Sequence, residues 1–375
     1  MAARKLKVLV AHHRWWYPTS VSGADLANHE FASRLRARGL DVRVYGISPP
    51  EAEIRVRQRD YVADGLPVCL VTTDFIRRLS ETVRDFSPDV VLTSCPGPSC
   101  GADDISRMVE TLCRHGLPVA LYVHDIDGTL PLFEAVKDRL AAVITNSGFM
   151  AARIREQWAV EADVVYPVPD RAAVEAGGTR GPFITFFNPL PHKGLSVAHN
   201  LVTRRFTDRP FLFVEGFIDP ESHGIALSRS GNLVHARRSP TVAAIYRMTR
   251  TLIVPSQWEE PFGRVALEAM YNRVPVVASR TGGLLESVGD GGVLIDDFGN
   301  VERWVEEIER LDDPTHRREI VAAGTAHAAK FSAEEETKKL IAVLRRAAGT
   351  KRRRRRKTEA PGSGDRGVGG TTTPR

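Results

Sequence analysis

The sequence contains 375 residues, which is enough for two domains of ordinary size. Hydrophobic residues make up 42% and charged residues 26%, which excludes a globally disordered or fibrous chain. The formal net charge of +6 arises in residues 349–375, where nine cations accompany two anions, whereas the 43 cations and 44 anions of residues 1–348 nearly cancel. The body lacks the basic footprint of a nucleic-acid-binding protein, so we expect no specific nucleic-acid partner.

The expected compartment and redox state follow from features that the sequence lacks. No apolar run approaches the ~18–20 residues of a membrane span. The apolar run Val8–Ala11 is too short for the core of a secretory signal. The four cysteines, which are Cys69, Cys95, Cys100 and Cys113, do not have the spacing of zinc ligands. We expect a cytoplasmic protein with buried, reduced thiols and no metal ion; a Cys95–Cys100 disulfide is the alternative.

The first half of the chain alternates short β-branched runs with longer helical patterns. We expect strands at 7–11, 42–46, 90–93, 118–123 and 142–145, and helices at 23–39, 75–86, 103–114, 132–140 and from Ser147, as an N-cap, to about 158. Such an alternation predicts a parallel sheet that is covered on both faces. We therefore assign residues 1–166 to a Rossmann-like domain.

The second half repeats this alternation after a stretch rich in proline and glycine, residues 167–182, which predicts a linker. We expect strands at 183–187, 211–215, 251–255, 275–278 and 293–295, and helices at 195–206, 241–248, 262–271, 284–288, 301–311 and 314–330. Residues 183–331 then form a second Rossmann-like domain, and 332–348 a final helix with Ser332 and Glu335 spaced as a capping box. Ligands bind beyond the carboxyl ends of such strands, so the cleft between the domains is the predicted site.

The C-terminal tail, residues 349–375, begins with seven consecutive cations at 351–357 and continues with glycine, serine and threonine. Charge repulsion and glycine content predict that it is disordered. A weak contact of 351–357 with an anionic membrane surface would place the protein at the inner face of a membrane. A solvated extension without a partner is the alternative.

The segment with the most specific chemistry is Pro255–Met270, which is predicted to be a strand end, a loop and a helix. Residues 262–264 fall at the helix start, where free N–H groups and the helix dipole attract an anion. Glu260 precedes the helix and Glu268 lies within it, and both are suited to accepting hydrogen bonds from hydroxyl groups. An anion site beside two hydroxyl acceptors is what a nucleotide-sugar requires.

These glutamates lie in Glu-Pro-Phe-Gly-x-x-x-Leu-Glu-Ala-Met, and Thr-Gly-Gly-x-x-Glu follows at 281–286. The segment resembles the donor-site signature of retaining GT-B glycosyltransferases, family 4, with a strong match from about 255 to 292 and weaker matches over roughly 6–345. The resemblance implies an α/β GT-B fold of two Rossmann-like doubly wound domains facing a cleft, with the C-terminal helix 332–348 crossing back onto the first domain. It implies that the first domain binds an acceptor, that the second binds a nucleotide-sugar, and that neither a metal nor a cofactor is needed.

The same resemblance assigns roles in the second domain. Glu260 would lie near the donor sugar at the reacting face, and Glu268 would bind the ribose hydroxyls. Further residues expected around the donor are Phe262, Gly263, Arg264, Val265, Gly282 and Gly283. Glu286 is either the acid that usually follows the two glycines in this family or a surface acid that caps a helix.

The leaving diphosphate is assigned to Lys193, in the second match Phe187-Asn-Pro-Leu-Pro-His-Lys-Gly194. A lysine at this place is a point charge that would stabilise the leaving group. Family members usually carry an arginine five residues earlier, where this chain has Asn188. Either Arg264 or Arg280 compensates for the missing arginine, or Asn188 donates neutral hydrogen bonds.

Two further matches lie in the first domain. Ser22-Gly23-Ala24-Asp25 resembles the Gly-Gly-Ala-Glu turn of the family, and Gly23 would let the diphosphate approach the backbone. His124 follows a strand and would bond a sugar hydroxyl or stabilise developing charge. Aromatic residues suited to stacking on an acceptor ring follow the first strand, namely His13, Trp15, Trp16 and Tyr17. Core packing of one tryptophan is the alternative.

The expected activity is sugar transfer, with retention and without a metal, from a UDP- or GDP-sugar to an unidentified acceptor, for which a small or medium-sized molecule is favoured. The resemblance favours front-face transfer, in which the leaving phosphate accepts the proton of the acceptor, over double displacement through Glu260. Two alternatives stay open. One is another GT-B activity, such as a nucleotide-sugar epimerase or hydrolase, and the other is a polyanion- or membrane-binding protein with a degenerate site.

Overall fold

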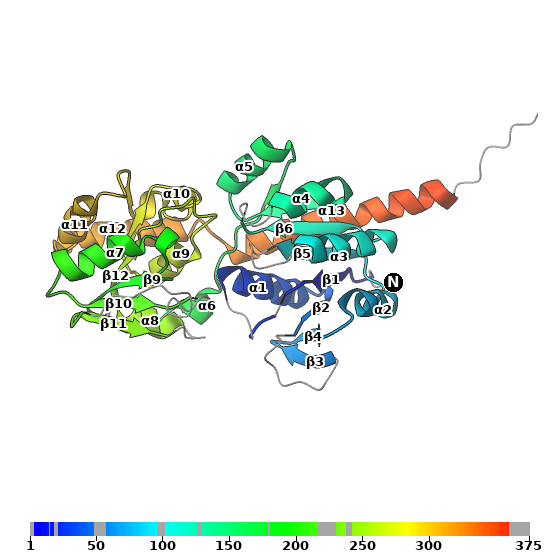
Figure 1. The fold of residues 1–375 in the computed structure, drawn as a ribbon, viewed down its shortest axis with the longest axis horizontal. Helices are drawn as coiled ribbons and strands as arrows, with labels where there is room; N and C mark the ends of the chain where they lie inside the picture. Colours follow the sequence, from blue (N-terminus) through cyan, green and yellow to red (C-terminus); the bar gives the residue numbers. More distant parts are fainter. Residues whose placement is uncertain are drawn as a thin grey trace, which may run out of the picture.

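The computed structural model describes residues 4–14, 16–18, 22–48, 58–95, 102–125, 130–178, 181–216, 230–237 and 242–359. Over these residues the chain forms two α/β domains that lie side by side (Figure 1). Each domain has its own sheet, and strands of the two sheets do not pair with one another.

The N-terminal sheet has eight strands within the described residues, in the order β3-β4-β2-β1-β5-β6-β7-β8. The strands are β1 (Lys7–Ala11), β2 (Asp41–Ile47), β3 (Gln58–Ala63), β4 (Leu66–Val71), β5 (Val90–Cys95), β6 (Val119–Val123), β7 (Ala142–Thr145) and β8 (Asp163–Val164). All neighbours are parallel except β3 and β4, which form an antiparallel hairpin at one edge.

Helices cover both faces of this sheet, as the hydrophobic pattern predicts. In β1 the buried side chains alternate: Leu9 and Ala11 belong to one core layer, and Val8 and Val10 to the other. The first layer packs against α2 (Phe75–Phe86), α3 (Ala102–Arg114), α4 (Leu130–Val136) and α5 (Gly148–Trp158). The second layer packs against α1 (Gly23–Ala37) and the C-terminal helix α13 (Ala333–Glu359).

The C-terminal sheet is parallel throughout the described residues, in the order β11-β10-β9-β12-β13-β14. Its strands are β9 (Phe183–Phe187), β10 (Phe211–Val214), β11 (Leu233–Ala236), β12 (Thr249–Val254), β13 (Val276–Ser279) and β14 (Val293–Ile295). Its helices are α7 (Leu195–Asn200), α8 (Val242–Met248), α9 (Arg264–Tyr271), α10 (Leu284–Ser287), α11 (Val301–Arg310) and α12 (Pro314–Ala328), and short helical turns at Lys137–Arg139, Pro191–Lys193, Leu201–Arg205 and Gly289–Gly291 complete the two domains.

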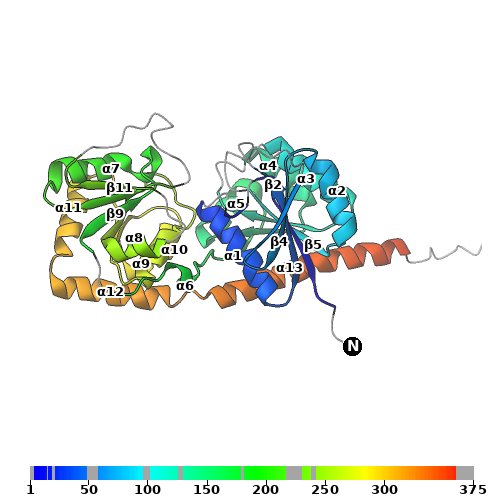
Figure 2. The ribbon, with the colours of Figure 1, turned by 90° about the horizontal axis from the view of Figure 1, so that it is seen from below.

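The final helix α13 returns from the second domain to the first, and Figure 2 shows it running on from α12 across the N-terminal sheet. Leu340, Val343, Leu344 and Ala347 are buried in the core of the first domain. The predicted return of this helix is therefore confirmed by its packing. Within the described residues, no helix is both long and apolar enough to span a membrane.

The predicted disorder of the whole tail needs correction, because α13 extends through Glu359 and includes the basic run 351–357. Arginine and lysine are good helix formers, and extending an existing helix avoids the cost of nucleating a new one. Residues 360–375 lie outside the described residues.

Most predicted elements match the observed ones within a few residues, but the short strands β8 and β11 were not predicted, and two further regions differ. The hairpin β3–β4 was not predicted, although its two-residue turn, Asp64-Gly65, is a recognised hairpin signal. Both residues have positive φ, 49° and 78°, as such a turn requires. The predicted linker 167–182 contains the short helix α6 (Arg171–Val174). The side chain of Asn272, at the end of α9, bonds the carbonyl oxygen of Val174, the last residue of α6, and the N–H of Ala176 just after it.

The loop that carries Lys193 is held against the loop after β12 by a close approach at Gly194. Gly194 has φ +90°, and a Cβ atom there would lie 1.8 Å from the carbonyl oxygen of Pro255. We predict that Gly194→Ala lowers the free energy of unfolding by more than about 2 kcal/mol, because the new Cβ both strains the backbone and clashes with backbone.

Gly177→Ala is the matched control, because its Cβ would meet no heavy atom within 4 Å. It should change stability by less than about 0.5 kcal/mol. Urea unfolding of the two variants measures both values, and equal effects would contradict the packing of these loops.

Candidate active site

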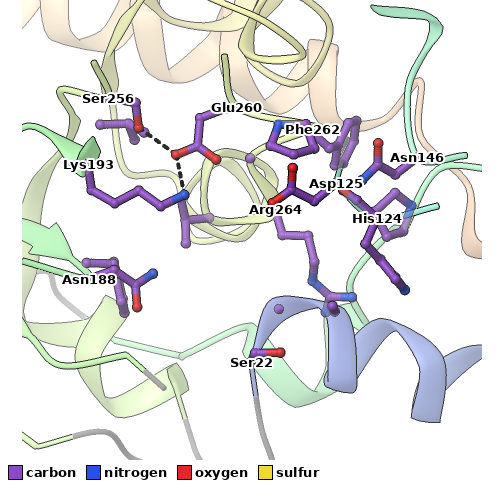
Figure 3. Close-up of a pocket in the computed structure, with 18 of the residues that line it drawn as sticks. Ser22, His124, Asp125, Asn146, Asn188, Lys193, Ser256, Glu260, Phe262 and Arg264 are labelled. Carbon is purple, nitrogen blue, oxygen red and sulfur yellow. Dashed lines mark hydrogen bonds and ion pairs between the residues drawn. The ribbon is translucent and has the colours of Figure 1, made fainter. Parts of the chain in front are cut away.

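A cleft of about 290 Å³ lies between the two domains, at the carboxyl ends of both sheets. The first domain supplies the start of α1 and the residues that follow β6 and β7, including His124 and Asn146. The second domain supplies Asn188 and Lys193 after β9, and residues 256–265 after β12. Figure 3 shows side chains from both domains facing this space.

The centre of the second-domain wall is a buried ion pair. The Oε1 atom of Glu260 accepts hydrogen bonds from Lys193 Nζ at 2.7 Å and from Ser256 Oγ at 2.5 Å, as drawn in Figure 3. Burial by itself raises the pKa of Glu260, but the Lys193 ammonium and the two hydrogen bonds outweigh it and hold the pKa below its usual value. The site therefore keeps a carboxylate and an ammonium together inside the cleft.

The two glycines expected at the donor lie behind Glu260 and are absent from the cleft wall. The N–H of Gly283 donates to the carbonyl oxygen of Glu260 at 2.6 Å. A Cβ atom at Gly282 would lie 2.4 Å from that same oxygen, and one at Gly283 would lie 2.2 Å from the carbonyl oxygen of Pro261. The glycines thus let one backbone segment pack directly on the other and fix the loop that presents Glu260.

Arg264 opens α9 and reaches across the domain boundary. Its Nη1 and Nη2 atoms donate to the two carboxylate oxygens of Glu30, on α1, at 3.0 and 2.9 Å. Burial alone would lower the pKa of Arg264, but the Glu30 and Glu268 carboxylates hold it above the usual value. Arg264 lines the cleft as predicted, yet its guanidinium is already paired and joins the domains.

Glu268 is buried one helical turn beyond Arg264 and does not line the cleft. Its Oε2 atom accepts a hydrogen bond from Tyr246 Oη at 2.9 Å, and its Oε1 atom lies 3.7 Å from Arg264 Nε. Burial raises the pKa of Glu268 above its usual value despite the nearby guanidinium. In this structure the residue that the sequence assigns to the ribose is engaged with protein groups.

Asn188 lines the cleft at the position where an arginine was expected. Its φ is +56°, a conformation that asparagine tolerates better than most residues. Its side chain occupies the space beside Gly216, where a Cβ atom would lie 1.4 Å from Asn188 Oδ1. Arg280, one of the two residues expected to compensate, lies outside the cleft wall and pairs with Asp296.

The start of α1 forms the opposite wall. Ser22 is its N-cap: Ser22 Oγ accepts from the N–H of Asp25 at 3.2 Å, while the Asp25 carboxylate accepts from the N–H of Ser22 at 3.0 Å. Gly23 follows in the cleft wall, as predicted. Asp25 therefore supports the turn and does not itself line the cleft.

His124 is buried in the same wall, next to Asn146 in Figure 3. Its Nε2 atom lies 3.0 Å from Asn28 Oδ1, and its carbonyl oxygen accepts from Asn146 Nδ2 at 2.8 Å. Burial lowers the pKa of His124 to about 3, with further lowering from His12, Arg264 and Arg14. The imidazole is therefore neutral near pH 7, a state in which it can exchange hydrogen bonds with a hydroxyl group and supplies no positive charge.

Contacts that the sequence did not predict hold the cleft closed beside Glu260. The Glu286 carboxylate accepts from the N–H groups of Gly148 and Phe149, at 2.9 and 2.7 Å, and so caps α5 of the other domain. Ser147 Oγ donates to the carbonyl oxygen of Pro261 at 2.6 Å. Of the two interpretations of Glu286, the helix cap is the one observed, although the helix belongs to the other domain.

The described acceptor-side aromatic residues do not line this cleft, and for Trp16 the alternative of core packing is the one observed. Trp16 is 2% exposed and packs in the core beneath α1. Tyr17 stacks on His29 with ring centroids 4.2 Å apart, and His13 packs edge-on against Phe75. None of these three lines the cleft, because apolar surface near the end of β1 is buried against neighbouring side chains. Trp15 lies outside the described residues.

Two cysteines have side chains within the part of the chain that the structure describes. Cys69 and Cys113 are half-buried and form no disulfide there, whereas Cys100 and the side chain of Cys95 lie outside what the structure describes. Among the described residues, no cluster of three or more histidine, cysteine, aspartate or glutamate side chains has the geometry to hold a metal ion.

The opposite pKa shifts of the two glutamates predict opposite pH dependences. The lowered pKa of Glu260 means that its contribution to stability is present above the unfolded-state pKa and is lost as the pH falls through the folded-state pKa. The raised pKa of Glu268 gives a contribution that is present at low pH and is lost as the pH rises.

We therefore expect the stability advantage of wild type over Glu260→Gln to shrink between pH 7 and pH 3, and its advantage over Glu268→Gln to grow. Urea unfolding at both pH values measures the four differences. Changes of the same sign in both variants would contradict the assigned environments.

Two family models match the chain, one in each domain. The model described as Glycosyltransferase Family 4 matches residues 21–170. The model described as Glycosyl transferases group 1 matches residues 227–327, which include the ion-pair glutamate and helix α9. The two matches together reach both walls of the cleft.

Curated relatives with similar sequences are named D-inositol 3-phosphate glycosyltransferase. One, from Corynebacterium diphtheriae, is 38% identical over 120 residues, which are 29% of this chain and 27% of that protein. Another, from Corynebacterium aurimucosum, is 27% identical over 291 residues, which are 76% of this chain and 58% of that protein. The chain thus spans less than two thirds of the length of these relatives.

Solved structures show the same fold at low sequence identity. Sucrose-phosphate synthase from Thermosynechococcus elongatus superposes with a TM-score of 0.73 at 15% identity, over 92% of this chain and 100% of that one. Anabaena Alr3699/HepE, solved in complex with UDP and glucose, gives a TM-score of 0.71 at 16% identity, over 90% and 99% of the two chains. With both family models matched and this architecture present, the chain belongs to glycosyltransferase family 4 and has the GT-B fold.

Proposed function

We propose that this protein transfers a sugar from a nucleoside-diphosphate sugar to an acceptor, with retention of the anomeric configuration and without a metal or other cofactor. The observation that carries the proposal is the Lys193–Glu260 ion pair, buried in a cleft between two Rossmann-like domains beside the start of α9. Lys193, as a cation for the leaving diphosphate, and Glu260, as an acceptor for sugar hydroxyls, are thus joined by a direct hydrogen bond.

In the proposed reaction the bond between the sugar anomeric carbon and the diphosphate breaks, and a bond to the acceptor oxygen forms on the same face. The proton of the acceptor hydroxyl passes to the leaving diphosphate oxygen. Lys193 stabilises the charge that develops on that diphosphate, and Glu260 orients the sugar. Because Glu260 is held ionised by Lys193, it accepts hydroxyl hydrogen bonds readily and has no proton to give.

The proposed donor is a UDP- or GDP-sugar. Anabaena HepE has been solved with UDP-glucose, and an E. coli structure described as trehalose-6-phosphate has been solved with UDP-2-fluoro glucose, which supports testing UDP-sugars first. The substrate must displace or share the Lys193–Glu260 bond on entry. Ribose binding by Glu268 requires the Tyr246 and Arg264 contacts to rearrange as well.

The proposed acceptor is a small or medium-sized hydroxyl compound. The curated relatives are named for D-inositol 3-phosphate, which is therefore the first acceptor to test. The described aromatic candidates next to β1 do not line the cleft, so recognition by ring stacking is not part of this proposal. A weak contact of residues 351–357 with an anionic membrane surface rests on their charge alone.

Replacing the central carboxylate should abolish most of the activity. We predict that Glu260→Ala reduces the rate of sugar transfer by at least ~10²-fold, the usual loss for one electrostatic contact in a transition state. The measurement is product formation by chromatography and mass spectrometry, with UDP- and GDP-sugars as donors and D-inositol 3-phosphate among the acceptors.

Glu309→Ala, on the exposed face of α11, is the control and should retain wild-type activity. Near-wild-type rates in Glu260→Ala would refute the site. Release of free sugar or of an isomerised donor without any acceptor would instead identify a hydrolase or an epimerase.

A further inference from the structure

A chain of buried polar side chains leads away from His124 into the first domain. Asn28 Oδ1 lies 3.0 Å from His124 Nε2, Asn28 Nδ2 donates to Ser94 Oγ at 2.9 Å, and Ser94 Oγ lies 3.2 Å from His12 Nδ1. All four residues are less than 8% exposed. They come from the ends of β1, β5 and β6 and from α1, so four elements meet at this chain.

The hydrogen-bond donors and acceptors of these four side chains are all matched when the bonds run in one direction, from His124 to Asn28 and from Asn28 through Ser94 to His12. Asn28 Oδ1 can only accept, so His124 Nε2 carries the proton. Ser94 Oγ accepts a hydrogen bond from Asn28 Nδ2, so the Ser94 hydroxyl donates its own hydrogen to His12 Nδ1. Both imidazoles then carry their proton on Nε2, which is the tautomer that neutral histidine prefers in water. The opposite direction would turn the Asn28 amide over and place both protons on Nδ1.

The free nitrogen of His124 is the one relevant to a ligand. No described residue bonds His124 Nδ1, although His124 lines the cleft. With the proton on Nε2, this nitrogen presents a lone pair and accepts a hydrogen bond from a hydroxyl group. With the proton on Nδ1, the same nitrogen would be a donor, and it would face a hydroxyl oxygen instead.

We propose that Asn28 is a positioning residue that holds the proton of His124 on Nε2, so that Nδ1 accepts a hydrogen bond from a hydroxyl of the bound sugar or acceptor. The identity of the ligand rests on the proposed function, whereas the tautomer is a property of the protein alone. Asn28 acts through His124 and touches no ligand itself.

The charges around the chain favour neutral imidazoles. The positive charges of Arg264 and Arg14 lower the pKa of His124, and the Asp25 carboxylate raises that of His12 against the effects of burial and Arg14. Burial lowers the pKa of His12 to about 4 and that of His124 to about 3. Neither ring therefore gains a second proton near pH 7, and a single hydrogen-bond direction persists over the physiological range.

The first test measures the tautomer directly, by nitrogen-15 NMR of histidine-labelled full-length protein without substrate. His124 is assigned from the signal that disappears in His124→Asn. The proposal requires a protonated Nε2 and an unprotonated Nδ1 in the wild type. A proton on Nδ1 would overturn it, and so would an equal mixture of the two tautomers.

The second test replaces Asn28 by aspartate, which keeps the shape and the acceptor but adds a charge. A carboxylate at this distance should raise the pKa of His124, because it favours the protonated imidazole, and His124 then loses its lone pair on Nδ1 as the pH falls. We expect kcat of Asn28→Asp to fall below pH 6 while wild type keeps its rate, with a smaller effect on KM.

Ser33→Ala is the matched control, because Ser33 lies on the same helix and its hydroxyl has no hydrogen-bond partner among the described residues. An unchanged His124 titration in Asn28→Asp would overturn the positioning role. If Asn28→Asp fails to fold, the His124 tautomer measured by NMR in the wild type still tests the proposal. Absence of any sugar transfer would refute the proposed function and leave the tautomer assignment intact.

Discussion

The buried ion pair between Lys193 and Glu260 is the interaction on which the site depends. It joins the loop after β9 to the loop after β12, and each charge offsets the cost of removing the other from water, because the side chains of Lys193 and Glu260 are only 19% and 10% exposed. Close backbone packing at Gly194 and at Gly282 fixes the two loops around it. The glycines thus hold a pair of charges whose separate burial would cost several kcal/mol per ion.

The cleft is closed by a second set of contacts that run between the domains. Arg264 joins α9 to Glu30 of α1, and Glu286 caps α5 with its carboxylate. Both contacts pair a charge of one domain with a group of the other, and both flank the ion pair. Because these bonds form only when the domains are close together, they favour the closed arrangement in which His124 faces Glu260 across the cleft.

The fold and the central residues could be predicted from the sequence, because strand and helix periodicities and the glutamate spacing are local signals. The capping of α5 by Glu286 could not be predicted, because Glu286 and the start of α5 are more than a hundred residues apart in the sequence and meet only where the two domains pack together. The same holds for Glu30 and for the chain through Asn28. The sequence could not decide whether Trp16 faces a ligand or the core, because an aromatic residue near a cleft has the same sequence signature in both cases. The Asp64-Gly65 hairpin turn was a local signal that could have been used.

The central claim is that Lys193 binds the diphosphate of a nucleotide-sugar, and calorimetric binding of nucleotides tests it most directly. The comparison uses UDP, GDP, ADP and dTDP with the corresponding monophosphates, on wild type and on Lys193→Ala. The account predicts that one diphosphate binds wild type and that its Kd weakens by at least about tenfold in the variant, the loss expected for one charged hydrogen bond. Its monophosphate should be nearly unaffected. Equal affinity of the diphosphate for both proteins would contradict the account.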